Sequence, residues 1–257
     1  MSVQIKLHLW HLFNHVLAIA GLIYIGTTLD YWWFAVSYAM FVLSGMVGVN
    51  IGLHRYLSHK SFTTGKHRDI FLKYLSILSG LGSPIVWVAM HRHHHATSDT
   101  DKDIQAPANI GVLRAWFLDY NPATFGPSIV RDIMSCQHSK FIHKHYFQIL
   151  IALYAVVACV NPLLTVFLLA LPAVLCFHGA AALGVLTHRW GYQVVESKDN
   201  SYNNILASIL SLGEGWHNYH HRHPMDYQQG HQWFEFDPAA HIIRWGFMTN
   251  EKKKKEQ

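Results

Sequence analysis

The chain has 257 residues, of which 51% are hydrophobic and only 14% charged, and its formal net charge is +5. Ordinary soluble domains carry roughly 25% charged residues, so this composition argues against a soluble protein and for one embedded in a membrane. The three cysteines form no CxxC pair and no even-numbered set, which argues against a disulfide framework. We expect one membrane-embedded domain over residues 1–257 that binds no nucleic acid.

Four apolar segments are candidates for membrane-spanning helices, which need about 20 residues each. They lie at about 9–27, 31–53, 146–160 and 163–186. The last two are separated by Asn161 and Pro162, which cannot continue a helix undisturbed. A fifth apolar segment, about 70–90, carries Lys73 and a glycine-containing interruption, so we expect it to lie along the membrane interface or to re-enter. The predicted fold is an all-α integral membrane protein, with four spans and a cytoplasmic helical cap.

The distribution of basic residues predicts the orientation in the membrane. The turns at 27–30 and 161–162 hold no Lys or Arg, whereas the stretch 54–145 is rich in both, so by the positive-inside rule that stretch is cytoplasmic. Both termini then face the cytoplasm as well. The last four residues resemble a dilysine retrieval signal of the endoplasmic reticulum, and a bacterial plasma membrane is equally compatible with the chain.

Histidine is the most unusual component, with 21 copies, and eight of these form three clusters at the ends of apolar segments. The clusters read HRYLSH from His54, HRHHH from His91 and HNYHH from His217. On an α-helix, residues i, i+3 and i+4 share a face, so the second and third clusters each direct three histidines to one side, and His93 points away. His54 and His59 lie about 140° apart on an ideal helix, so we expect them to flank a helix end or to bind different metals. Neutral imidazole suits iron, zinc and copper, and the clusters predict a shared metal site at one face of the membrane.

These motifs resemble the three histidine boxes of the integral-membrane fatty-acid desaturases. The forms HRYLSH and GEGWHNYHH are most similar to the acyl-CoA, stearoyl-type Δ9 branch, and residues 98–101 resemble the S-x-T-D stretch of that branch. The resemblance covers about 43–238 and implies two iron ions bound by nine histidines, the ninth matching His188. Carried over, one iron takes His54, His59, His91, His95 and His221, and the other takes His94, His188, His217 and His220. Gly184 stands where the family often has an Asn that holds a water on the second iron, which leaves the coordination of that iron open.

The resemblance also implies the reaction and its partners. Saturated C–H bonds do not yield to acid, base or nucleophile, and redox iron with O₂ supplies the missing chemistry: two hydrogens leave adjacent carbons, a cis double bond forms and O₂ becomes two waters. The acyl substrate is carried by CoA, acyl-carrier protein or a lipid, and a separate ferredoxin or cytochrome b5 type protein donates the electrons. Glu214 and Asp99 are expected to orient the liganding imidazoles. The candidate substrate-binding residues are Trp87, Ala180 and Gly184 along an acyl tunnel, and Arg55, Arg92 and Arg189 at its cytoplasmic mouth.

Two other classes of function stay open at this point. A related three-box oxygenase, such as a carotenoid ketolase or hydroxylase or an alkane hydroxylase, shares the motif set, although the box forms favour the desaturase. A metal transporter or storage protein is the alternative from a different class. A transporter should carry ionisable residues near the middle of several spans, whereas here the clusters lie at segment ends.

Overall fold

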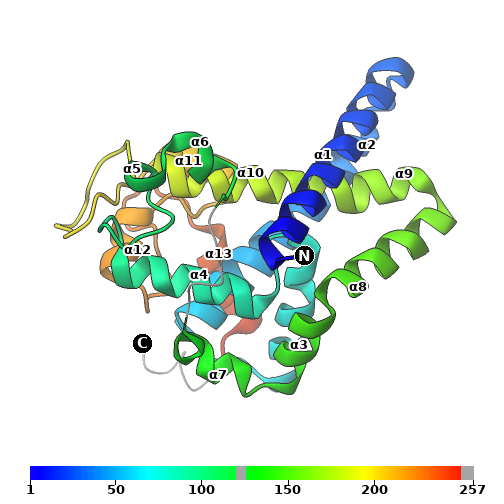
Figure 1. The fold of residues 1–257 in the computed structure, drawn as a ribbon. Coiled ribbons are helices and arrows are strands. Elements are labelled where there is room, and N and C mark those ends of the chain that lie inside the picture. The colour runs from blue at the N-terminus through cyan, green and yellow to red at the C-terminus, as the bar shows by residue number, and fades with distance from the viewer. Residues whose placement is uncertain (120–125, 250–257) are drawn as a thin grey trace.

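The computed structural model describes residues 1–119 and 126–249, and all regular elements within these ranges are helices (Figure 1). Two isolated bridges that share Asn203 are the β pairings of this part of the chain. The predicted all-helical class is therefore confirmed.

Within residues 1–119 and 126–249, four long helical units are apolar enough to cross a membrane, as predicted. The first is α1 (Val3–Thr28), and the second joins α2 (Trp32–Phe41) to the π-helix η1 (Val42–Ser58). The third is α8 (Gln137–Val160), and the fourth runs through α9 (Pro162–Leu164), η5 (Thr165–Ala170) and α10 (Leu171–Leu186). The first and third begin well before the apolar segments, because polar residues at their start remain helical. Asn161 ends α8 and caps α9 through its side chain, which explains the predicted break.

The fifth apolar segment is bent. α3 (Lys66–Leu75) with η2 (Ser76–Ser79) meets α4 (Pro84–Thr97) at 85°. Gly80 and Gly82 lie in the bend at φ values of 72° and 114°, a region in which a side chain is strained. The bend excludes a straight span, and α4 runs from it toward α12 (Figure 1).

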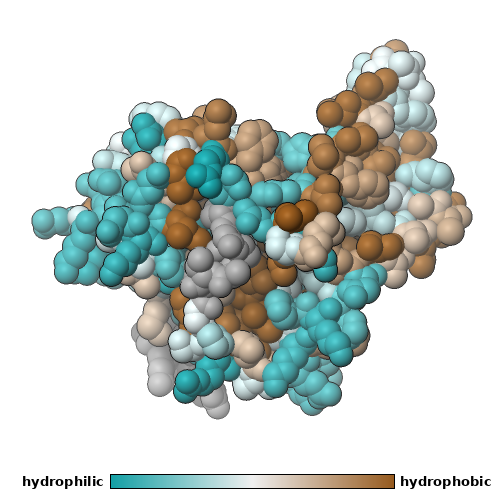
Figure 2. Space-filling view, viewed as in Figure 1, coloured by the Kyte–Doolittle hydropathy of each residue, from teal (hydrophilic) through white to brown (hydrophobic). Residues whose placement is uncertain are grey.

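Short helices form a cap at one end of the spans (Figure 1). They are α5 (Pro107–Ile110), α6 (Val112–Trp116), η4 (Pro127–Val130), α7 (Arg131–Met134), α11 (Ile205–Leu210), α12 (His217–Arg222), α13 (Pro238–Ile242) and η6 (Ile243–Phe247). Figure 2 shows hydrophobic residues along the projecting arm of α1 and hydrophilic residues over much of the cap. That division is the one expected of a protein with membrane-spanning helices and a water-facing cap.

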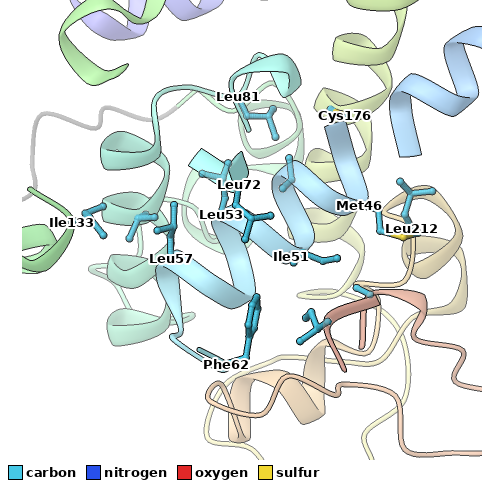
Figure 3. Close-up of a cluster of buried hydrophobic side chains, with 14 of the residues drawn as sticks. Met46, Ile51, Leu53, Leu57, Phe62, Leu72, Leu81, Ile133, Cys176 and Leu212 are labelled. Carbon is cyan, nitrogen blue, oxygen red and sulfur yellow. The ribbon is translucent and has the colours of Figure 1, made fainter. Parts of the chain in front are cut away.

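The largest apolar core lies where η1 meets the cap. Ile51, Leu53 and Leu57 of η1 are buried against Leu72 of α3 and Leu212 of the chain that precedes α12 (Figure 3). This packing fixes the end of η1, which carries the first histidine cluster, against the elements that carry the other two.

Candidate metal centre

Nine histidines meet at the junction of spans and cap, in two groups. The first group holds His54, His59, His91, His95 and His220, and the second holds His94, His188, His217 and His221. Within each group the ring nitrogens that could bind a metal all lie within 4.8 Å of one another. The nine predicted ligands are therefore brought together, and all three clusters lie on one side of the spans.

The π-helical winding of η1 explains how His54 and His59 join the same group. The backbone N–H of His59 donates to the carbonyl of His54 over 3.2 Å, which is the i to i+5 hydrogen bond of a π-helix. Two residues five apart then lie one above the other. This agrees with the resemblance, which placed both histidines on one iron. Of the two alternatives that the spacing left open, binding to different metals assumed α-helical winding and is not what the structure shows.

His220 and His221 each belong to the opposite histidine group from the one that the resemblance implied. Nε2 of His220 lies 2.9 Å from Nε2 of His54 and 3.0 Å from Nε2 of His95, so His220 belongs to the first group. His221 stacks on His95 but its ring belongs with His94, His188 and His217. His220 and His221 are neighbours on the short helix α12 and point in different directions. Because α12 lies between the two groups, each histidine joins a different one. The assignment of His221 to the first iron and His220 to the second was therefore wrong.

Four carboxylates hold the imidazoles in one tautomer. Nδ1 of His94, His188 and His221 donates to Asp103, Asp99 and Asp199 over 2.9, 2.9 and 2.7 Å, and Nδ1 of His54 donates to Glu214. With Nδ1 protonated, each Nε2 presents a lone pair to its group. Nε2 atoms of His94 and His188 face each other at 3.1 Å, where two lone pairs repel unless a cation lies between them. The arrangement fits a bound metal ion, and histidine with a carboxylate behind it is the usual form of such a ligand.

Glu214 and Asp99 lie behind histidines as predicted, whereas three further partners were missed. Asp103 closes the acidic run that includes Asp99, so the sequence held a signal for it. The other two are Asp199 and Gln229, whose side-chain amide contacts Nδ1 of His220 at 3.1 Å. Both come from stretches outside the boxes, so no sequence signal indicated them.

Burial keeps the imidazoles of the third box neutral. It lowers the pKa of His217 and His220 far below the ordinary value, with a further contribution from neighbouring histidines. Burial also lowers the pKa of His221, to about 4, although its hydrogen bond to Asp199 opposes the shift. Burial alone would raise the pKa of Asp103, but the hydrogen bond from His94, the charge of His94 and the backbone N–H groups of Gln105 and Asp99 together outweigh it and lower the pKa. Neutral imidazole and ionised carboxylate are the states that a metal site requires.

We expect Asp103→Asn to weaken metal retention roughly 10- to 100-fold, the usual cost of losing a partner behind a metal ligand. The amide no longer accepts the His94 Nδ1–H as strongly, so His94 loses its fixed tautomer. Titrating the purified protein with a chelator and counting the remaining iron measures the effect. Asp101→Asn is the matched control, because Asp101 is exposed and lies two residues away. Equal chelator sensitivity of the two variants would contradict the role of Asp103.

A cavity of about 150 Å³ adjoins both histidine groups. Trp87, Ala180 and Gly184 line it, together with ligands from both groups such as His54 and His217. Trp87 stacks on the ring of His91 with centroids 4.9 Å apart. The three residues predicted for an acyl tunnel thus border the space next to the candidate metal ions.

The structure gives two of the three predicted mouth arginines another role. The Arg55 side chain is 1% exposed and donates to Glu214 at 2.7 Å and to Asp237 at 2.9 Å. Arg92 donates to Asp132 at 2.8 Å and to the carbonyls of Leu57 and Ser58. Both guanidinium groups are paired with carboxylates of the protein, and their predicted place at the cytoplasmic mouth of the acyl tunnel stays a prediction. Arg189 is exposed and lies over the Trp190 ring.

Gly184→Leu should fill part of the cavity without disturbing the fold, because a Cβ added there meets no atom within 4 Å. We expect a lower rate with an acyl substrate and an unchanged iron content, since the side chain competes with substrate and not with a ligand. Gly26→Leu is the control: Gly26 has the same free space but lies in α1 outside the cavity lining. A product assay at several substrate concentrations compares the two. Unaltered kinetics in Gly184→Leu would show that substrate does not pass Gly184.

Comparison with known proteins gives one consistent result. The family model for fatty acid desaturase matches residues 30–251. The chain is 30% identical over 224 residues to the icosanoyl-CoA 5-desaturase of Limnanthes douglasii, which covers 81% of this chain and 62% of that protein. It is 32% identical over 212 residues to the sn-1 stearoyl-lipid 9-desaturase of Anabaena variabilis, covering 80% of this chain and 78% of that protein. It is also 30% identical to a chloroplastic palmitoyl-monogalactosyldiacylglycerol delta-7 desaturase of Arabidopsis thaliana, of whose length it spans 58%. The histidine groups and the family match agree, and the chain belongs to the fatty acid desaturase family.

Proposed function

We propose that this protein introduces a cis double bond into a fatty acyl chain, using O₂ and two iron ions held by the two histidine groups. The observation that carries the proposal is the pairing of nine inward-facing imidazoles with an adjoining cavity. Two hydrogens leave adjacent carbons, and O₂ with two electrons and two protons from outside gives two waters. The box forms favour a Δ9-like position and CoA as the carrier.

The residues of the chain perform the tasks that the reaction requires of a protein. The nine histidines would hold the metal ions, which supply the capacity to activate O₂ when bound. Ala180, Leu183 and Gly184 present small or apolar surfaces to the cavity, so they admit methylene groups and exclude water. Asp99, Asp103, Asp199 and Glu214 fix the orientation of the imidazoles. Trp87 holds His91 by stacking and limits the space beside it.

Expression in a desaturase-deficient host, followed by mass spectrometry of the fatty acids, tests the reaction and the position of the double bond. An oxygenated product would instead assign the chain to the carotenoid ketolases and hydroxylases or the alkane hydroxylases. Supplying the purified protein with acyl-CoA, acyl-carrier-protein or lipid-linked acyl chains in parallel identifies the carrier. Formation of no double bond with any of the three would overturn the proposal.

The electron donor is a separate protein of the ferredoxin or cytochrome b5 type. Reconstitution with each donor in turn, with acyl substrate in excess, should show turnover with one of them. Both termini are proposed to face the cytoplasm, in the endoplasmic reticulum or a bacterial plasma membrane. The dilysine-like residues that bear on this choice lie outside the described part of the chain.

A metal transporter is not favoured by the position of the histidines. Both groups lie at the cap end of the spans, and carboxylates behind them fix the rings in place. His15 and His178 do lie within spans, but Nε2 of one contacts Nε2 of the other at 3.1 Å and Trp116 donates to Nδ1 of His178. These contacts fasten α1, α6 and α10 together.

A further inference from the structure

A second, larger cavity lies between α1 and α8, away from the histidine groups. Its volume is about 1150 Å³, and it shares the side chain of Leu7 with the cavity at the metal centre. Trp10 and Phe13 of α1 form one wall, and Phe147 and Ile151 of α8 form the other. Figure 1 shows α8 diverging from α1 on the side of the α8–α9 turn. We call this space the α1–α8 groove.

The groove has the dimensions and polarity of a site for a lipid chain. From Phe147 to Ala158 α8 rises by about 16 Å, which is roughly one leaflet of a hydrocarbon core about 30 Å thick. α1 and α8 are also the least buried spans, at 28% and 22%, against 50% and 72% for the other two. Where they meet, the Tyr154 hydroxyl donates to Asn14 at 2.6 Å and its ring packs on Trp10. The lining of the groove on both helices is mostly apolar.

One end of the groove is positively charged. Lys6 of α1 and Lys144 of α8 are both exposed and both line it, and no Asp or Glu occurs among its described lining residues. The Nζ of Lys6 lies 5.9 Å from the centroid of the Phe147 ring, so this side chain reaches from α1 across to α8. Neither lysine forms an ion pair within the described part of the chain. Two unpaired ammonium groups at the end of an apolar groove of leaflet depth complement an anionic phosphate joined to an acyl chain.

We propose that the α1–α8 groove binds an anionic phospholipid, with its phosphate between Lys6 and Lys144 and an acyl chain along Phe13 and Ile151. The lipid fills the space that the two spans leave and fastens the start of α1 to α8. Gln4, His8 and His11, on another face of α1, line the cavity beside the metal centre. The bound lipid therefore supports one wall of that cavity without contacting the histidine groups.

Native mass spectrometry of the purified protein in mild detergent tests the site directly. After exchange against equimolar phosphatidylglycerol and phosphatidylcholine with the same acyl chains, we expect retention of one phosphatidylglycerol per chain. At about 1 kcal/mol for each lysine, its preference over phosphatidylcholine should be roughly thirty-fold. Lys6→Gln combined with Lys144→Gln should reduce the preference to near unity. Lys66→Gln combined with Lys140→Gln removes the same charge from exposed lysines outside the groove and should leave the preference unchanged.

A second pair of variants tests the apolar part. Ala155 lines the groove and Ala152, one turn earlier on α8, is exposed outside it. Ala155→Trp should expel the lipid, and Ala152→Trp should retain it. Equal retention of both lipids by the wild-type chain, or a preference that survives the loss of Lys6 and Lys144, would overturn the proposal. So would isolation of a dimer or a complex whose partner helix fills the groove. Lipid retention is measured without turnover, so the result is independent of the proposed desaturase activity.

Discussion

His220→Ala should abolish product formation and remove the iron of the five-histidine group, while the protein remains in the membrane. Nε2 of His220 lies within 3.0 Å of the same atom in both His54 and His95, so it contacts one ligand from η1 and one from α4. The two groups share no histidine, and the other group should keep its metal. Iron per purified chain should fall by about half, as measured by metal analysis, with fatty-acid mass spectrometry as the activity readout.

His94→Ala is the equivalent change in the four-histidine group. It should also abolish the product and halve the iron, because Nε2 of His94 faces Nε2 of His188 at 3.1 Å. His93→Ala is the control: His93 is the chain neighbour of His94 on the same helix and belongs to neither group. Persistent product in either ligand variant, or loss of product in the control, would contradict the assignment of the groups.

The histidine boxes and the spans were predictable from the sequence because both depend on local spacing. Predicting the four spans requires only the length and hydropathy of the apolar segments. Predicting that the histidines of an H-x2-HH pattern share a face requires only the α-helical repeat. The resemblance placed His59 with His54, but spacing alone did not, since the α-helical repeat does not describe the π-helical winding of η1. The assignment of His220 and His221 depends on where α12 lies between the two groups, which is a tertiary property that spacing does not contain.

The residues behind the histidines differ in how far they lie from the boxes in the sequence. Glu214 and Asp99 lie next to boxes, so proximity in sequence indicated proximity in space. Asp199 and Gln229 approach their histidines through loops whose path the sequence does not show. The ion pairs of Arg55 were not predictable for a related reason: its place in a box shows a positive charge near the site, but not that Glu214 and Asp237 lie on either side of it.

Arg55→Met should destabilise the protein by about 3–5 kcal/mol, the usual cost of removing one partner from a buried charge network. Arg55 is 1% exposed, and its loss leaves the carboxylates of Glu214 and Asp237 buried without their common counter-charge. Glu214 accepts from His54, and Asp237 accepts from the backbone N–H of Gln229, which contacts His220. The damage should therefore reach two ligands of the five-histidine group and none of the other group directly.

Thermal unfolding in detergent measures the first effect, and Mössbauer spectroscopy of ⁵⁷Fe-loaded protein measures the second. Arg55→Lys keeps the charge but lacks the planar fork that reaches two carboxylates at once, so its midpoint should lie between those of Arg55→Met and the wild type. Arg189→Met removes an exposed arginine and should change stability by no more than about 0.5 kcal/mol. If Arg55→Met unfolded at the wild-type temperature, the network would contribute nothing to stability. Glu214 and Asp237 connect Arg55 to the five-histidine group alone; the four-histidine group has its own carboxylates, Asp99, Asp103 and Asp199. Equal changes in both iron signals of Arg55→Lys would therefore show that Arg55 does not act through Glu214 and Asp237.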